Sequence, residues 1–374
     1  MVSAPVHASV SGVVKAFTTI SLPNGTRTQT VVLENDGEDA FCVPLARSVA
    51  EPEGLEAAEI VNLMLEAGLA GMGGAAFPTH VKYRLPGNTK IDTVILNGVE
   101  CEPYLTCDHR LMLEDAEDIV LGLRLMLRAG GAARGIVGIE ENKPDAVSVM
   151  RKQLAPWPQL EVKVLRLKYP QGEERLLIKA ITGRNVPLGA LPAAAGVVVN
   201  NVATAAALGR AFRTGMPLTD RIVSVAGSGV ENPGNWRVRL GTPLEELLAA
   251  AHWRGTSTLL AGGPMTAPAI FDLKTPVTKG TSGIVALDEQ IASPDPCIRC
   301  GKCVQVCPYG VMPLYVDTYL EQERFSELEE VGLTNCRECG GCAFVCPAHR
   351  PLLQTIRLAK AKLGKLAGEV KANG

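Results

Sequence analysis

The stretch Cys297-Ile-Arg-Cys300-Gly-Lys-Cys303-Val-Gln-Val-Cys307-Pro308 recurs, as a pattern, in Cys336-Arg-Glu-Cys339-Gly-Gly-Cys342-Ala-Phe-Val-Cys346-Pro347. Both stretches fit C-x2-C-x2-C-x3-C-P without a gap. Three thiolates at this spacing bind one face of an iron–sulfur cubane, and the fourth, redirected by the proline, reaches the neighbouring cluster. Paired zinc sites do not need this spacing of the third and fourth cysteines, twice over. The pattern therefore predicts two [4Fe–4S] clusters.

The same pattern predicts how the ligands are shared, because each cluster takes three cysteines from one motif and one from the other. The expected ligands are Cys297, Cys300, Cys303 and Cys346 for cluster 1, and Cys336, Cys339, Cys342 and Cys307 for cluster 2. Clusters held through crossed ligands lie close together and carry one electron each. We therefore expect this region to transfer electrons.

Composition limits the remaining possibilities. The chain has 374 residues, enough for two or three domains, and its formal net charge of −2 offers no basic excess for nucleic-acid binding. Eleven cysteines in a cytoplasmic chain favour metal ligation over disulfides. Cys42, Cys101 and Cys107 fall outside the paired motif and are expected to be buried structural thiols.

The sequence predicts neither a secretory signal nor a membrane span. Residues 1–10 lack a basic segment followed by an apolar one. The most apolar stretch, residues 189–209, is broken by Pro192, Asn200 and Asn201. We expect a cytoplasmic protein that could still dock on a membrane partner.

Apolar periodicity divides the rest of the chain. Residues 1–45 alternate apolar and polar around the turn Pro23-Asn24-Gly25, which predicts a β-hairpin. Between residues 46 and 220, strands and helices alternate, which predicts a parallel sheet with its ligand at the carboxyl ends of the strands. The expected helices there span residues 56–67, 111–129 and 143–154, and the expected strands span 91–96, 135–139 and 161–167.

Two further segments complete the chain. Residues 221–275 predict a small β-grasp-like module with a short helix at 244–251. The tail at 352–371 predicts a basic amphipathic helix, interpreted as a solvated helix face rather than as a docking surface.

A glycine-rich loop spans residues 68–83 (GLAGMGGAAFPTHVKY). It contains Gly71, Gly73 and Gly74, but it is neither a G-x-G-x-x-G fingerprint nor a P-loop. Such glycine density lets backbone N–H groups approach a flat ring or a phosphate, and Lys82 could then meet a phosphate. A plain surface loop is the alternative.

Polar residues follow at three places where a buried segment ends. The first is Asn97-Gly-Val-Glu100-Cys-Glu102-Pro103, directly after a predicted strand. The second is Gly172-Glu173-Glu174, and the third is Asn200-Asn201-Val-Ala-Thr204.

Taken together, these motifs resemble the NADH-binding flavoprotein subunit of respiratory complex I. Its patterns are G-R-G-G-A-G-F-P-T-G-x-K-W, N-A-D-E-x-E-P, G-E-E and V-N-N-V-E-T. The order of the modules resembles still more closely the C-subunit family of the Rnf complex, a membrane-bound ferredoxin:NAD⁺ oxidoreductase. The resemblance covers nearly the whole chain. Met72 stands where the complex I pattern has Arg, and Val99 stands where it has Asp.

The resemblance implies a fold for each part of the chain. Residues 1–45 would form a partial β barrel-sandwich at the N-terminus, and residues 46–220 an α/β flavin/NADH-binding domain. Residues 221–275 would form a β-grasp (SLBB-like) module. Residues 285–374 would form an α+β two-cluster ferredoxin-like domain with a basic C-terminal helix.

The resemblance also implies roles for individual residues. Glu100 and Glu102 would orient the nicotinamide or tune the flavin, with no acid or base needed for hydride transfer itself. The expected cofactor-binding residues are Gly71, Gly73, Gly74, Lys82, Asn97, Glu173, Glu174, Asn200, Asn201 and Thr204.

The implied function is an NADH-dependent oxidoreductase subunit of an ion-translocating complex. NAD(H) would exchange hydride with FMN, and single electrons would pass through the two clusters to partner subunits, and indirectly to ferredoxin. The expected location is the cytoplasmic face of the inner membrane, as a peripheral protein without a transmembrane segment. One alternative is an NADH-dependent cobalamin reductase of a propanediol-utilisation microcompartment. Another is a binding protein with a decayed flavin site, which only Val99 supports.

Overall fold

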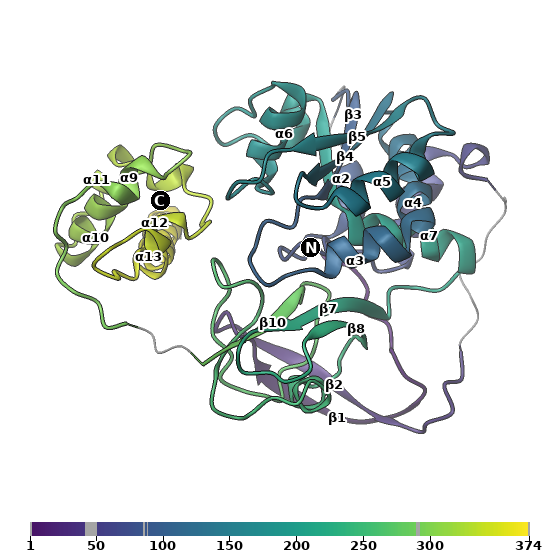
Figure 1. Cartoon of the computed structure of the whole chain (residues 1–374), viewed down its shortest axis with the longest axis horizontal. Coiled ribbons are helices and arrows are strands. Elements are labelled where there is room, and N and C mark those ends of the chain that lie inside the picture. The colour runs from purple at the N-terminus through teal and green to yellow at the C-terminus, as the bar shows by residue number, and fades with distance from the viewer. Residues whose placement is uncertain (1, 42–50, 85–86, 88, 289–291, 373–374) are drawn as a thin grey trace. The chain divides into compact units, whose positions relative to one another are not determined.

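A computed structural model describes residues 2–41, 51–84, 87, 89–288 and 292–372 (Figure 1). The chain divides into two compact units, Met1–Asp288 and Glu289–Gly374, which are described separately below. Cys42 and the end of the predicted N-terminal segment lie outside the described residues.

The centre of the first unit is a four-stranded parallel sheet in the order β5-β4-β3-β6. Three of its strands were predicted: β3 (Thr93–Gly98), β4 (Arg134–Glu140) and β5 (Leu160–Leu165). Strand β6 (Val197–Asn201) was not predicted from the sequence. Since all four strands run the same way, the residues that follow β3, β4 and β6 meet at one edge of the sheet.

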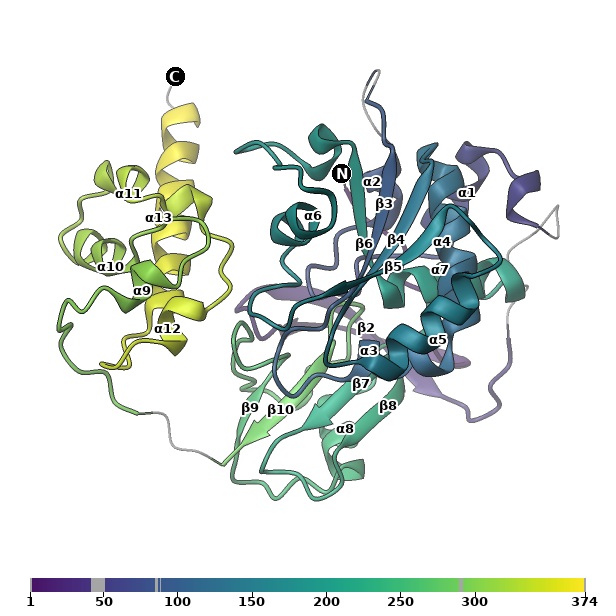
Figure 2. The same ribbon diagram turned by 45° about the horizontal axis from the view of Figure 1, so that its top comes forward.

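Both faces of this sheet are covered, because successive side chains of a strand point to opposite faces. Val94 and Leu96 of β3 belong to the large core, while Ile95 belongs to a smaller one on the other face, with Leu177 and Ile178 of α6. Figure 2 shows α6 on one side of the sheet and α4, α5 and α7 on the other. The helices are α1 (Ala57–Glu66), α2 (Thr79–Tyr83), α3 (Cys107–Glu114), α4 (Ala116–Gly130), α5 (Pro144–Leu154), α6 (Glu174–Thr182) and α7 (Val202–Thr214).

The structure corrects two predictions about helices. The helix expected at 111–129 is two helices, α3 and α4, separated at Asp115. The carboxylate of Asp115 accepts hydrogen bonds of 3.1 Å from both Arg210 and Arg237, so distant partners favour the break. The end of the predicted glycine-rich loop is also helical, since α2 occupies Thr79–Tyr83.

The β-grasp module is a mixed sheet in the order β8-β7-β10-β9. Its strands are β7 (Asp220–Ala226), β8 (Gly234–Arg239), β9 (Thr258–Leu260) and β10 (Gly283–Leu287). Strand β10 pairs in parallel with β7 and antiparallel with β9, and it lies beyond residue 275. The predicted short helix is α8 (Leu244–Ala250), which buries three leucines.

The N-terminal segment forms the predicted hairpin. Strands β1 (Gly12–Ser21) and β2 (Arg27–Asn35) pair antiparallel, with a register shift between Val14 and Ala16. The segment is tied to the β-grasp module where Arg239 donates to both carboxylate oxygens of Asp39, at 2.6 and 2.7 Å.

The second unit contains helices and loops, with no strand among its described residues, 292–372, so the strands of an α+β arrangement are not found there. Its elements are α9 (Lys302–Gln305), α10 (Pro313–Glu321), α11 (Glu327–Glu330), α12 (Gly341–Phe344) and α13 (Leu352–Ala372). Helix α13 is the predicted basic helix. Arg357 and Lys360 on it pair with Glu338, at 3.0 and 2.7 Å. Among the helices described in either unit, none is both long enough and apolar enough to cross a bilayer.

Candidate functional site

The two cysteine motifs adopt the same backbone conformation. Arg299 and Glu338 occupy equivalent positions, with φ of 57° and 56°. Each donates its backbone N–H to the sulfur two residues earlier, Cys297 at 3.4 Å and Cys336 at 3.3 Å. Gly301 and Gly340, also left-handed, precede α9 and α12. The repeat is therefore a structural repeat as well as a sequence repeat.

The first set of predicted ligands surrounds one small cavity. Cys297, Cys300 and Cys303 line it together with Cys346 from the second motif. This is the crossed arrangement that the spacing predicts, and thiolates are the donors that an iron–sulfur cubane requires. The residues present therefore fit a cluster, and the ligand assignment stays a prediction.

The second set is more buried. Burial raises the pKa of the Cys336, Cys339 and Cys342 thiols, to about 12 for Cys342, and neighbouring cysteines raise it further. Cys307 of the first motif is one of the neighbours acting on Cys336 and Cys339. Thiols with such raised pKa values become thiolates only beside a compensating cation, which bound iron would supply. These four residues fit a second cluster.

In the first unit, the glycine-rich loop is held against α7. Gly71 N–H donates to the carbonyl of Phe77 at 2.8 Å, and Met72 N–H donates to Oγ1 of Thr204 at 3.0 Å. Gly74 has φ +108°, and a Cβ built there would meet nothing within 4 Å. A backbone that turns toward open space in this way suits close approach by a flat cofactor.

Asn201 joins this loop to a pair of buried carboxyl groups. Its Oδ1 accepts from Ala203 N–H at 2.8 Å and so caps α7, while its Nδ2 donates to Asp108 at 2.6 Å. A Cβ on Gly73 would lie 3.5 Å from Asn201, so this loop residue packs directly on the asparagine.

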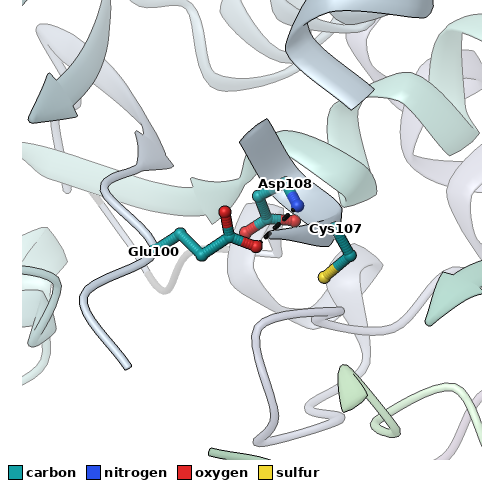
Figure 3. Close-up of side chains that lie close together, drawn as sticks. All are labelled: Glu100, Cys107 and Asp108. Atoms are coloured by element: carbon teal, nitrogen blue, oxygen red, sulfur yellow. Dashed lines mark hydrogen bonds between the residues drawn. The ribbon is translucent and has the colours of Figure 1, made fainter. Parts of the chain in front are cut away.

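Glu100 is the second carboxyl of the pair. It accepts from the backbone N–H of Asp108 at 2.7 Å, at the start of α3 (Figure 3). It also accepts from the backbone N–H of His109 at 3.0 Å. Burial raises the pKa of Glu100 to about 7 and that of Asp108 to about 6. Cys107 lies beside them and is buried, as predicted for a structural thiol.

The strand end after β3 is tightly bonded. Asn97 Nδ2 donates to Gly172 O at 2.8 Å, and Lys143 Nζ donates to Val99 O at 2.8 Å. Val99, which occupies the Asp position of the complex I pattern, is fully buried in the smaller core. Cys101 is half-buried, and its sulfur accepts from Gly172 N–H at 3.4 Å.

Glu102 has different partners from Glu100. It accepts from Met265 N–H at 3.0 Å and from the hydroxyl of Thr266, both in the β-grasp module. Burial raises its pKa. The structure thus separates the surroundings of two glutamates that were predicted to act together.

The remaining predicted residues lie around β6 and α6. Glu173 caps α6 by accepting from Arg175 and Leu176 N–H at 3.1 and 3.0 Å. Lys82 Nζ donates to Val199 O at 2.7 Å and lies 3.7 Å from Glu174.

Burial lowers the pKa of Lys82 and raises that of Glu174. Asn200 donates to the hydroxyl of Tyr83 at 2.7 Å. Two buried side-chain oxygens in this region, Thr79 Oγ1 and Gln171 Oε1, have no partner among the described residues. Buried polar atoms normally have a hydrogen-bond partner, and a bound ligand would supply the partners that these two oxygens lack. The residues of this region therefore fit a flavin nucleotide.

Sequence reasoning missed three charged residues of this region: Asp108, Lys143 and Arg221. The polarity of the segment after β3 was a signal for Asp108 alone. Lys143 and Arg221 bond to Val99 and Met72, which lie 44 and 149 residues away in the chain. Arg221 is the clearest case, since its Nη2 donates to Met72 O of the glycine-rich loop at 3.2 Å.

Models of known families match four parts of the chain. A Nuo51 FMN-binding domain matches residues 64–210, and a 4Fe-4S dicluster domain matches 289–357. An SLBB domain matches 222–269, and an RnfC barrel sandwich hybrid domain matches 1–38. Fold and site therefore define a flavin and iron–sulfur oxidoreductase, with FMN and [4Fe–4S] clusters as its cofactors.

Curated relatives narrow this class. The chain is 44% identical over 97% of its length to the C subunit of the Na(+)-translocating ferredoxin:NAD(+) oxidoreductase complex of Acetobacterium woodii, covering 83% of that protein. It is 42% identical over 97% of its length to the C subunit of the ion-translocating oxidoreductase complex of Rhodobacter capsulatus, covering 71% of that protein. The chain belongs to the family of Rnf complex C subunits, which confirms the resemblance found in the sequence.

Solved structures confirm the fold class. The crystal structure of the NAD+-reducing [NiFe]-hydrogenase in the H2-reduced state matches with a TM-score of 0.58 and 22% identity, over 82% of this chain and 65% of that one. The air-oxidised state matches with a TM-score of 0.54 and 23% identity, over 74% of this chain and 54% of that one. At this identity the likeness concerns the fold alone.

Proposed function

We propose that this protein is the subunit through which NAD(H) exchanges electrons with an ion-translocating membrane complex. Hydride would pass between NAD(H) and FMN in the first unit, and single electrons would pass through two [4Fe–4S] clusters in the second. The carrying observation is that one chain joins an FMN-binding domain to a dicluster domain with crossed cysteines. Nicotinamide transfers two electrons together whereas a cubane accepts one, so a flavin is needed between them.

When bound, FMN supplies this conversion of hydride into single electrons. The protein's own residues would hold it and set its surroundings. The glycine-rich loop, kept in place by Thr204 and Asn201, would present backbone N–H groups, and Lys82 would supply a nearby positive charge. Glu173, Glu174 and Asn200 would complete the wall formed by α6 and β6.

Glu100 would hold a proton beside the flavin. Its pKa of about 7 means that its carboxyl oxygens can bind or release a proton near neutral pH, as the charge beside them changes. The positive charge of Lys143 favours the ionised carboxylate of Glu100. It therefore lowers the pKa of Glu100 and opposes part of the effect of burial. Glu102, bonded to Met265 and Thr266, would instead keep the β-grasp module against the segment after β3.

The partners follow from the relatives, which are named as subunits of ferredoxin:NAD(+) and ion-translocating oxidoreductase complexes. We infer that this chain binds other subunits of such a complex at the cytoplasmic face of the membrane, and that ferredoxin exchanges electrons with it indirectly. The domains expected from the sequence, 1–45, 46–220, 221–275 and 285–374, are kept as a proposal with one change: β10 extends the β-grasp module to residue 287, so the cluster domain begins after residue 288.

The test is an anaerobic preparation of the full chain. We expect one FMN and about eight irons per chain, as two cubanes require. NADH should bleach the flavin absorbance and produce an EPR signal from reduced clusters. Zinc or no metal at the cysteines, or flavin that NADH does not reduce, would refute the proposal. Cob(III)alamin offered against ferredoxin as acceptor tests the cobalamin-reductase alternative, which no feature of the fold or site favours.

A further inference from the structure

Arg221, on strand β7 of the β-grasp module, carries a buried positive charge. The residue is 2% exposed, and its guanidinium donates to three backbone carbonyls, of Ile222 at 3.3 Å, Met72 at 3.2 Å and Lys279. Within the described residues it forms no salt bridge with a carboxylate. The titratable groups that act on it from other elements are the carboxylate of Asp108 and the thiol of Cys107, both on α3, and burial raises the pKa of that thiol so that it stays neutral.

Such a charge is costly to bury. Carbonyl dipoles compensate only part of the hydration that a guanidinium loses, and buried charges are normally paired. Burial accordingly lowers the pKa of Arg221. The side chain stays charged, because arginine is protonated throughout the physiological range. Arg221 therefore contributes a positive potential, opposed by the carboxylate of Asp108 on α3, and an incoming negative charge would interact favourably with the guanidinium.

The position of this charge connects it to the glycine-rich loop. Met72 is fixed on both sides, since its N–H donates to Thr204 and its carbonyl accepts from Arg221. The segment around Lys279 packs on the same loop, because a Cβ on Gly280 would lie 3.1 Å from Gly74 O. Arg221 thus bonds to the loop and to the segment that supports it.

We propose that Arg221 is a positioning residue for the flavin, and that its buried charge raises the reduction potential of FMN held by the glycine-rich loop. This inference rests on the proposed function. Hydride from NADH brings two electrons and one proton to the flavin and leaves NAD⁺. Unless a second proton follows, the flavin gains one negative charge. A fixed cation behind the loop stabilises that charge more than it stabilises the oxidised form.

The same reasoning assigns the opposite effect to Asp108. Its carboxylate lies near both Arg221 and Asn201, and it would disfavour added negative charge. An electrostatic role therefore requires that removing the cation and removing the anion shift the flavin potential in opposite directions. A purely structural role requires no such relation.

The experiment compares FMN midpoint potentials in the anaerobic full-length protein, at a pH above the raised pKa values of Glu100 and Asp108. Arg221→Gln should shift the oxidised-to-reduced equilibrium at least tenfold toward oxidised flavin, about 30 mV for a two-electron couple. Arg221→Lys keeps the charge but loses the planar fork, so it should retain the potential and release FMN more readily. Asp108→Asn should raise the potential. Arg239→Gln, which removes an exposed arginine from strand β8, should change neither quantity.

The proposal is overturned if Arg221→Gln binds FMN at an unchanged potential, or if Arg221→Lys lowers the potential as much as Arg221→Gln. It is also overturned if Asp108→Asn leaves the potential unchanged or lowers it. Should Arg221→Gln fail to fold, the lysine and Asp108 variants decide the matter. A wild-type chain that binds no FMN would instead refute the proposed function.

Discussion

Each of the two units is expected to bind a redox cofactor, but the units differ in how much hydrophobic core and regular secondary structure surrounds the cofactor-binding residues. In Met1–Asp288, some candidate flavin residues already contact one another, as Lys82 does with Glu174 and Asn201 with Asn97. The large core of this unit extends through both the parallel sheet and the β-grasp module. In Glu289–Gly374, the helices that carry the cysteines are as short as Lys302–Gln305 and Gly341–Phe344. Among the described residues, its hydrophobic core cluster comprises only Val311, Val316, Leu320, Leu328, Val331, Leu333, Ile356 and Ala359.

This difference teaches where each unit gets its stability. A domain of fewer than about 100 residues buries too little apolar surface to be very stable alone, and bound metal commonly supplies the rest. We therefore expect packing to hold the first unit together with or without flavin, and the clusters to hold the second.

Removing the clusters is the strongest way to break this comparison. After anaerobic treatment with a chelator and an oxidant, backbone amides of α10 and α13 should lose at least about 100-fold in hydrogen-exchange protection, because the cysteine loops no longer share a centre. Amides of β3 and β4 should keep their protection. Equal loss in both units would show that the first unit also depends on the clusters.

Single cysteine variants sharpen the comparison within the second unit. Cys300→Ser and Cys342→Ser should each lose about four of about eight irons, since each removes a ligand of one cubane. Cys300 is exposed, whereas Cys342 is partly buried against the core. We therefore expect Cys342→Ser to lower the melting temperature of the second unit more than Cys300→Ser does. Iron analysis and circular dichroism measure the two effects. Loss of all iron from both variants would mean that neither cluster survives alone.

A pH series tests whether the first unit tolerates buried charge without a cofactor. The pKa of Glu100 is raised from 4.5 in the unfolded chain to about 7 in the folded protein. Its contribution to stability is therefore complete below pH 4.5. That contribution is lost as the pH rises through about 7, because the buried carboxyl then ionises. Glu100→Gln should gain about 2 kcal/mol in unfolding free energy relative to wild type between about pH 5 and about pH 8. Urea unfolding measures this. Glu114→Gln, an exposed substitution on the same helix that Glu100 caps, should show no such gain.

The smallest expected effect concerns the ion pairs of Glu338. This residue is one-third exposed and pairs with Arg357 and Lys360, so Glu338→Gln should cost only about 1 kcal/mol in the second unit. Thermal unfolding of the cluster-loaded protein measures it. Glu321→Gln, at a more exposed ion pair with Arg350, should cost less. If Glu338→Gln lost much more stability than this, ion pairs would contribute a large part of the stability of the second unit. That result would contradict the assignment of this role to the clusters.

The sequence predicted best where interacting residues are close together in the chain. The cysteine motifs are contiguous, and the turn at Pro23–Gly25 joins neighbouring strands, so both were recognised. The break at Asp115 was missed because its partners, Arg210 and Arg237, are about a hundred residues away. The cap that Asn201 provides could only be recognised once β6 and α7 were placed. Strand β6 is a short valine run and α7 is alanine-rich, so neither carries a clear local signal.

The candidate site followed the same rule. Its predicted residues came from motifs recognised as a resemblance, whereas Asp108, Lys143 and Arg221 act through three-dimensional proximity alone. The hydrogen bonds from residues 265 and 266 to Glu102 likewise cross modules. No local pattern encodes such contacts.

The bonds of Glu102 and Arg221 across modules bear on how this chain can be re-engineered. A chimera that exchanged residues 220–287 for the equivalent segment of a relative would keep these bonds only if the new segment placed an N–H at 265, a hydroxyl at 266 and a guanidinium at 221. A recombination boundary between the two modules therefore has to preserve all three donors. A graft is better drawn directly after Asp288, where the first compact unit ends.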